Sequence, residues 1–261
     1  MNTVIVPVDF SPTSLNAAEY AAKMLTGVYG ANLVLYHMYE KSSEETSANE
    51  QLNDLKKKLS DKHIVKMETI AVLGDDLIEE IDRVVKHRHA NLVVMGITGK
   101  SAIAQVFIGS NTLKLVDRNV CPVLIVPDDA SFNGIKNVAL TSDFKNVRVT
   151  TPSIPIKAFL EMSRPYLHIV NVDNQHYVSL TAEYQKEKAV MQEMFSNFNP
   201  KFYFIGMNDF FDAIEQFIVD QKIDVLITIP RRHSFLSNIF KSSHTKKLVY
   251  HSRVPILAVH E

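Results

Sequence analysis

The stretch VIVPVDF at residues 4–10 decides the fold, because it returns as VALTSDF at residues 138–144. Two further stretches repeat in the same order: ANLVV at 90–94 returns as IDVLI at 223–227, and CPVLIVP at 121–127 returns as VPILAVH at 254–260. All three repeats lie 133 or 134 residues apart. Three matches in one order at nearly constant spacing indicate an internal duplication. The sequence therefore predicts two tandem copies of one small domain.

Within each copy, short β-branched runs alternate with longer segments of helical periodicity. In copy one we expect strands at 4–8, 32–38, 66–73, 92–95 and 123–126, and helices at 12–29, 48–60, 77–87 and 110–118. In copy two we expect strands at 138–142, 167–172, 201–205, 224–229 and 256–259. Strands that are apolar throughout and alternate with helices are typical of a parallel sheet covered on both faces. Each copy is therefore predicted to be a five-stranded, parallel, doubly wound α/β domain.

The boundary between the copies is predicted from composition. The segment DDASFNG at residues 128–134 is mostly polar, small and turn-forming, as linkers are. We expect one domain at residues 1–129 and the second at residues 135–261.

Composition narrows the classes of function. The chain is 46% hydrophobic and 22% charged, with a formal net charge of −1, so it has no overall field to recruit nucleic acid or an anionic membrane. The single cysteine, Cys121, excludes an intramolecular disulfide. We find neither a signal peptide nor an apolar run of membrane-spanning length, so we expect a cytoplasmic protein with no nucleic-acid or membrane partner.

A glycine pattern follows the fourth strand of copy one. Gly96, Gly99 and Gly109 form G-x2-G-x9-G-S-N, and the last glycine directly precedes a predicted helix. Open α/β sheets bind ligands beyond the carboxyl ends of their strands, at the switch point in strand order. Glycines there let the backbone approach a phosphate, and free N–H groups at a helix start favour an anion. The pattern favours phosphate or nucleotide binding, with plain turn chemistry as the alternative.

Two better-known phosphate motifs do not fit. A Walker A loop would match at Gly99-Lys100-Ser101, but its first glycine falls on Val94, inside the predicted strand. A dinucleotide fingerprint belongs after the first strand, not the fourth.

Copy two has lost the pattern. An offset of 133 pairs the three glycines with Ile229, Arg232 and Ser242, and the side chains of Ile229 and Arg232 would obstruct the same phosphate pose. The segment at 231–247 is strongly basic instead. Its cations could hold another acidic ligand, or they could form an ordinary solvated face. His233, His244 and His251 match no metal-ligand spacing, so we expect no metal site.

The residues VPVDFS at 6–11, His37-Met38 and MGITG at 95–99 followed by GSN at 109–111 resemble the universal stress protein family. The resemblance covers essentially the whole chain and implies the adenine nucleotide α-hydrolase-like fold, with the glycine motif marking the ATP-binding subgroup. It implies ATP, with AMP or ADP as alternatives, and Mg²⁺ held through the phosphates. The residues it assigns to nucleotide binding are Pro7, Val8, Asp9, Met38, Met95, Gly96, Thr98, Gly99, Gly109, Ser110, Asn111 and Thr112.

The resemblance also bears on assembly and activity. It implies that the two domains pair as a pseudo-dimer through the strands at 123–126 and 256–259, which would remove two exposed sheet edges; a homodimer is left open. We expect a nucleotide-binding stress or signalling module with little or no turnover, because no catalytic residue can be assigned. The alternatives are a slow ATP hydrolase and a scaffold without nucleotide whose C-terminal domain binds another acidic ligand.

Overall fold

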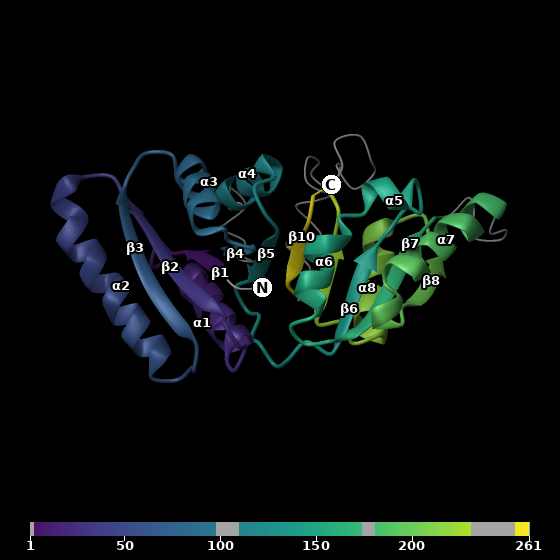
Figure 1. Ribbon diagram of the computed structural model, residues 1–261, viewed down its shortest axis with the longest axis horizontal. Coiled ribbons are helices and arrows are strands. Elements are labelled where there is room, and N and C mark those ends of the chain that lie inside the picture. Colours follow the sequence, from purple (N-terminus) through teal and green to yellow (C-terminus); the bar gives the residue numbers. More distant parts are fainter. Residues whose placement is uncertain (1–2, 98–109, 174–180, 231–253, 261) are drawn as a thin grey trace. The chain divides into compact units, whose positions relative to one another are not determined.

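The computed structural model describes residues 3–97, 110–173, 181–230 and 254–260. They form two compact units, Met1–Phe132 and Asn133–Glu261 (Figure 1). The division between the units falls inside the segment 128–134, which is the predicted linker.

The N-terminal unit is a parallel sheet with the strand order β3-β2-β1-β4-β5. Its elements are β1 (Thr3–Pro7), α1 (Pro12–Leu25), β2 (Asn32–Tyr39), α2 (Glu45–Ser60), β3 (Lys66–Leu73), α3 (Leu77–Arg88), β4 (Leu92–Ile97), α4 (Ser110–Arg118) and β5 (Val123–Pro127). Helix α2 lies along β2 and β3, α1 lies along β1 and β4, and α3 contacts α4. Because crossovers between parallel strands are right-handed, α1 and α2 cover one face of the sheet and α3 and α4 cover the other.

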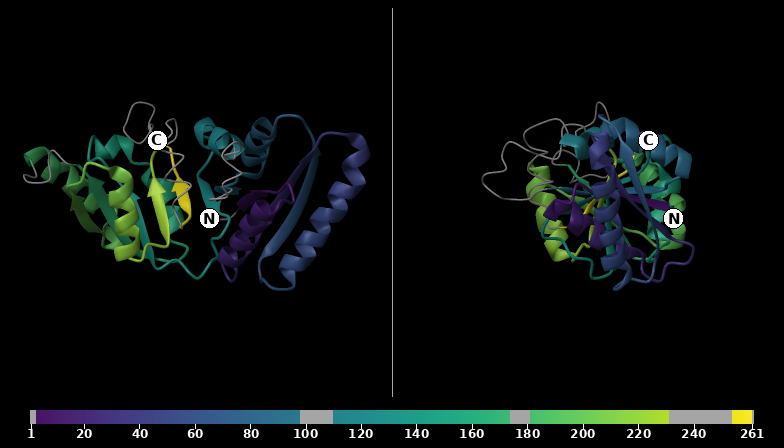
Figure 2. Two further views of the ribbon diagram at one scale, coloured as in Figure 1. Left: turned by 180° about the vertical axis from the view of Figure 1, so that it is seen from behind. Right: turned by 90° about the vertical axis from the view of Figure 1, so that its left-hand side faces the viewer.

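The C-terminal unit repeats this plan with the strand order β8-β7-β6-β9-β10. Its elements are β6 (Asn137–Thr141), α5 (Val147–Thr150), α6 (Ser153–Leu160), β7 (Tyr166–Val172), α7 (Ala182–Met194), β8 (Lys201–Ile205), α8 (Phe210–Asp220), β9 (Val225–Thr228) and β10 (Ile256–Ala258). Helices α6 and α7 cover one face of this sheet (Figure 1), and α8 covers the face seen from behind (Figure 2). The predicted fold class is thereby confirmed; the pairing of the units through β5 and β10 stays a prediction.

The first helix of each unit shows how local chemistry sets helix limits. Helix α1 begins at Pro12, where the Ser11 side chain accepts a hydrogen bond from the Ser14 N–H, as an N-cap does. It ends at Leu25, four residues before the predicted end. Gly27 and Gly30 have φ of +77° and +74°, and this left-handed backbone cannot continue the helix.

In the C-terminal unit the corresponding helix is split into α5 and α6 by the pair Thr151-Pro152. Thr151 has φ −109° and ψ 109°, the extended backbone that a following proline imposes.

A buried histidine in β7 gives the C-terminal unit a pH dependence. His168 is 5% exposed, and its ring nitrogens lie 3.1 Å from the Tyr203 hydroxyl and 3.3 Å from Asn137 Oδ1. Burial, with the nearby charge of Lys201, lowers the pKa of His168 below its ordinary 6.5. On acidification the unfolded chain therefore binds this proton before the folded one. The contribution of neutral His168 to the stability of the folded state is complete above the pKa that His168 has in the unfolded chain. It is lost as the pH falls toward the lower pKa of His168 in the folded state.

We accordingly expect the urea midpoint of the C-terminal unit to fall between about pH 7.5 and pH 5, and to fall less in His168→Gln. Urea unfolding followed by circular dichroism at several pH values measures this. An identical pH slope in the variant would contradict the assignment to His168.

Candidate functional site

The N-terminal unit has its switch point between β1 and β4, because the chain runs from β1 toward β2 on one side and from β4 toward β5 on the other. Both strands are parallel, so their carboxyl ends meet at one edge of the sheet, where such folds bind ligands. At this edge β1 ends with Pro7, which is followed by Val8 and Asp9. The same edge holds the end of β4, with Met95 and Gly96.

Asp9 presents a fixed carboxylate at the end of β1. The side chain is exposed, and its Oδ1 accepts hydrogen bonds from the Ser11 backbone N–H at 3.0 Å and from the Ser11 hydroxyl at 2.6 Å. Partial burial of the carboxylate raises the pKa of Asp9, but the hydrogen bonds from Ser11 and Ser14 outweigh this effect and leave the pKa below its ordinary value. The group is therefore an ionised acceptor of set direction at neutral pH.

Phe10 and His37 shape the turn that follows β1. Phe10 has φ +61°, a left-handed conformation that is uncommon for a bulky residue, and its ring centroid lies 4.7 Å from that of His37. His37 Nδ1 lies 2.7 Å from the Val8 carbonyl oxygen. Because a carbonyl only accepts, Nδ1 carries the proton and the second ring nitrogen remains for another partner.

The same turn is present in the C-terminal unit. Phe144 has φ +53°, and Asn171 Nδ2 donates to the Ser142 carbonyl at 2.9 Å, just as His37 donates to Val8. Asp143 Oδ1 accepts from the Lys145 N–H at 3.1 Å. The duplication has therefore kept this backbone path although the side chains differ.

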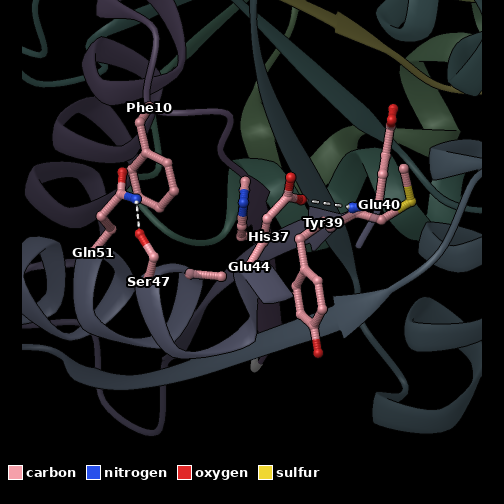
Figure 3. Close-up of a pocket in the computed structure, with 9 residues that line it drawn as sticks. Phe10, His37, Tyr39, Glu40, Glu44, Ser47 and Gln51 are labelled. Atoms are coloured by element: carbon pink, nitrogen blue, oxygen red, sulfur yellow. Dashed lines mark hydrogen bonds between the residues drawn. The ribbon is translucent and has the colours of Figure 1, made fainter. Parts of the chain in front are cut away.

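In the N-terminal unit, a cavity of about 380 Å³ opens beside the turn at Phe10, between the end of β2 and the start of α2 (Figure 3). It is lined by Phe10, His37, Met38, Tyr39, Glu40, Glu44, Ser47, Ala48 and Gln51. Glu44 Oε2 accepts from the backbone N–H groups of Glu40 and Lys41 at 3.2 and 3.3 Å, and Gln51 donates to Ser47 at 3.0 Å. The lining residues include two carboxylates and neither lysine nor arginine, so the cavity suits an uncharged, hydrogen-bonding group rather than a phosphate.

Gly96 is required by packing. A Cβ built on it would lie 2.5 Å from the Thr13 carbonyl oxygen and 2.7 Å from Thr13 Cγ2, so the first turn of α1 fits against β4 only where no side chain intervenes. Close packing therefore accounts for this glycine without any phosphate.

Helix α4 is tied to the same strand end. Thr112 is 1% exposed, and its hydroxyl donates to the Gly96 carbonyl oxygen at 3.3 Å. The Thr112 hydroxyl, which we expected to bind a phosphate, is thus hydrogen-bonded within the protein. The backbone N–H groups of the first turn of α4 have no partners within the helix, as at any helix start.

The structure brings most of the described site residues to this edge. Pro7, Val8 and Met95 are buried, Met38 and Gly96 are half-buried, and Asp9 and Asn111 are exposed; Ser110 begins α4. Of the predicted set, Met38 also lines the cavity. Thr98, Gly99 and Gly109 lie outside the described residues. The prediction missed Phe10 and Gln51 as cavity residues, although the return of Phe10 as Phe144 after an aspartate was a readable signal.

The fold defines a doubly wound α/β protein whose switch point lies between β1 and β4. The sequence profile described as Universal stress protein family matches residues 1–127. A Thermus aquaticus protein, described as a universal stress protein in the QAH/OAS sulfhydrylase 3′ region, is 31% identical over 134 residues, which cover 48% of this chain and 97% of that protein. The chain belongs to the universal stress protein family.

A solved structure supports the fold of the whole chain. The universal stress protein from Archaeoglobus fulgidus DSM 4304 is 18% identical and matches with a TM-score of 0.74, covering 99% of this chain and 98% of that one. The likeness therefore extends over both units.

Across the ranges that the structure describes, no helix combines the length and apolarity needed to cross a membrane.

Proposed function

We propose that this chain is an adenine nucleotide-binding module of a stress-response or signalling system, which binds one ATP, ADP or AMP in its N-terminal unit with little or no turnover. The observation that carries the proposal is the edge at the switch point, where the fixed carboxylate of Asp9 lies just after β1 and Thr112 of α4 is hydrogen-bonded to Gly96. Family membership and the glycine motif support it.

The charges around the site indicate which end of the nucleotide lies in the cavity and which lies at α4. Phosphates would be repelled by Glu40 and Glu44, so the uncharged base belongs at the cavity, near His37 and Met38. The start of α4 attracts anions through its backbone N–H groups and its dipole, and so it suits the phosphates. Between them, the Asp9 carboxylate suits the ribose, because it can accept hydrogen bonds from two neighbouring hydroxyls. By family resemblance, Gly99, Gly109 and Ser110 join the phosphate end, where Mg²⁺ would be held through the phosphates.

Asp9 is a poor candidate for a hydrolytic base. Its pKa lies below the ordinary value, which makes its carboxylate a weak proton acceptor, and its place is at the ribose rather than at the terminal phosphate. Hydrolysis needs a positioned water and usually a base beside that phosphate. We therefore expect phosphate release from ATP at the level of buffer alone; sustained release above it would favour the slow hydrolase.

Asp9→Ala is expected to weaken ATP binding by at least about tenfold, or about 1.4 kcal/mol. Asp143→Ala is the matched control, because Asp143 makes the equivalent turn contact in the C-terminal unit. Isothermal titration of the full chain with Mg-ATP should give one site in the wild type and in Asp143→Ala. Equal weakening by both substitutions, or none by Asp9→Ala, would contradict the proposed site. No binding to the wild type would favour the scaffold.

A further inference from the structure

Helices α2 and α7 occupy equivalent places, α2 between β2 and β3 and α7 between β7 and β8. The buried residues of α2 are Ala48, Leu52, Leu55 and Leu59. Near the end of α7, Met191 and Phe195 are fully buried at the same four-residue spacing as Leu55 and Leu59. Carried back along the helix, this alignment places Tyr184 where α2 has Ala48.

Ala48 lines the cavity of the N-terminal unit, so its counterpart bears on what fills the same place in the C-terminal unit. The Tyr184 ring centroid lies 6.1 Å from that of Phe144 and 6.5 Å from that of Phe204. Phe144 is the counterpart of Phe10 and has the same left-handed backbone, but it is only 2% exposed. The rings of the C-terminal unit therefore pack together where the N-terminal unit is open.

The Tyr184 hydroxyl also has a fixed partner. It donates a hydrogen bond to Asp173 Oδ2 at 3.0 Å. Burial, followed by this bond and the charge of Asp173, raises the pKa of Tyr184 to about 12, so the phenol stays neutral and acts as a donor. Lys188 Nζ lies 5.2 Å from the Phe202 ring centroid and 5.9 Å from that of Phe204, which helps hold the adjoining aromatic wall.

We propose that Tyr184 is a built-in occupant of a second small-molecule site. Its ring fills the C-terminal counterpart of the cavity, and its hydroxyl gives Asp173 the hydrogen bond that a bound ligand would otherwise give. The site behind it accepts one planar aromatic ring with a hydrogen-bond donor, of the phenol class, once the tyrosine side chain is removed. This second site does not depend on nucleotide binding by the N-terminal unit.

Chemical rescue tests this directly in the full chain. Tyr184→Ala should lower the melting temperature of the C-terminal unit by several degrees, and p-cresol, the free side chain of tyrosine, should raise it again in a dose-dependent way. Toluene should raise it less, because it cannot donate to Asp173. Wild type should not respond, because its site is filled. Tyr166→Ala is the control: Tyr166 is 70% exposed in the same unit, so its removal should leave no site for p-cresol.

A p-cresol response confined to Tyr184→Ala supports the proposal; no response there, or an equal response in wild type or Tyr166→Ala, overturns it. If Tyr184→Ala is unfolded at the start, far-ultraviolet circular dichroism replaces the melting curve, and failure of p-cresol to restore the fold overturns the proposal. Tyr184→Phe keeps the ring, so it should stay folded and remain unresponsive; a response of Tyr184→Phe would also overturn it.

Discussion

Replacing Gly96 by alanine is expected to lower the free energy of unfolding of the N-terminal unit by about 3 kcal/mol. The added methyl group would stand 2.5 Å from the Thr13 carbonyl oxygen, and 2.9 Å from the carbonyl carbon. Both are backbone atoms in the first turn of α1, so no side chain can rotate to make room. Either α1 moves away from β4 or the strand end bends. Guanidinium unfolding followed by circular dichroism, with hydrogen exchange in β1 and β4, measures the loss and locates it.

Gly74→Ala is the matched control. A Cβ at Gly74 would meet Glu80 Cγ and Met38 Sδ, both at 3.1 Å. These atoms belong to flexible side chains that can give way, so the cost should stay below about 1 kcal/mol. If the two substitutions cost the same, close packing against Thr13 is not what requires a glycine at position 96.

Phe144→Ala is expected to cost about 3–5 kcal/mol, and Phe10→Ala only about 1 kcal/mol. The two residues hold equivalent places and share a left-handed backbone, so any strain in an alanine there is common to both. They differ in surroundings. Phe144 is 2% exposed among Tyr184, Phe202 and Phe204, and its loss would leave a hole among packed rings. Phe10 is half-buried and already borders a cavity.

Chemical denaturation of the full chain, with hydrogen exchange read separately for the two units, measures both losses. The midpoint of the C-terminal unit should move far more in Phe144→Ala than that of the N-terminal unit moves in Phe10→Ala. Similar losses in the two variants would contradict the difference in packing.

The strands were predictable because short runs of apolar and β-branched residues between helical segments identify parallel strands. Even for the partly exposed edge strands β3 and β8, the predicted ranges 66–73 and 201–205 agree residue for residue. Helix ends were less predictable, since they depend on the backbone angles of single residues such as Gly27. The duplication could be recognised because it depends only on the order and spacing of the three repeated stretches.

The site was only partly predictable. Asp9 and Gly96 stand in a motif, but the reason for Gly96 could not be read, because Thr13 is far from it along the chain and the contact exists only once α1 packs on β4. The inward turn of the Thr112 hydroxyl likewise depends on where α4 settles against the strand end. A hydroxyl at a helix start looks the same in sequence whether it faces a ligand or the core.

The matching turns after β1 and β6 also have a practical consequence. Phe10 and Phe144 adopt one left-handed geometry, and each is preceded by a carbonyl that a side chain from the neighbouring strand holds in place. The short segments 8–11 and 142–145 therefore share one backbone path. We therefore expect that exchanging the two segments leaves the path of the main chain unchanged in both units.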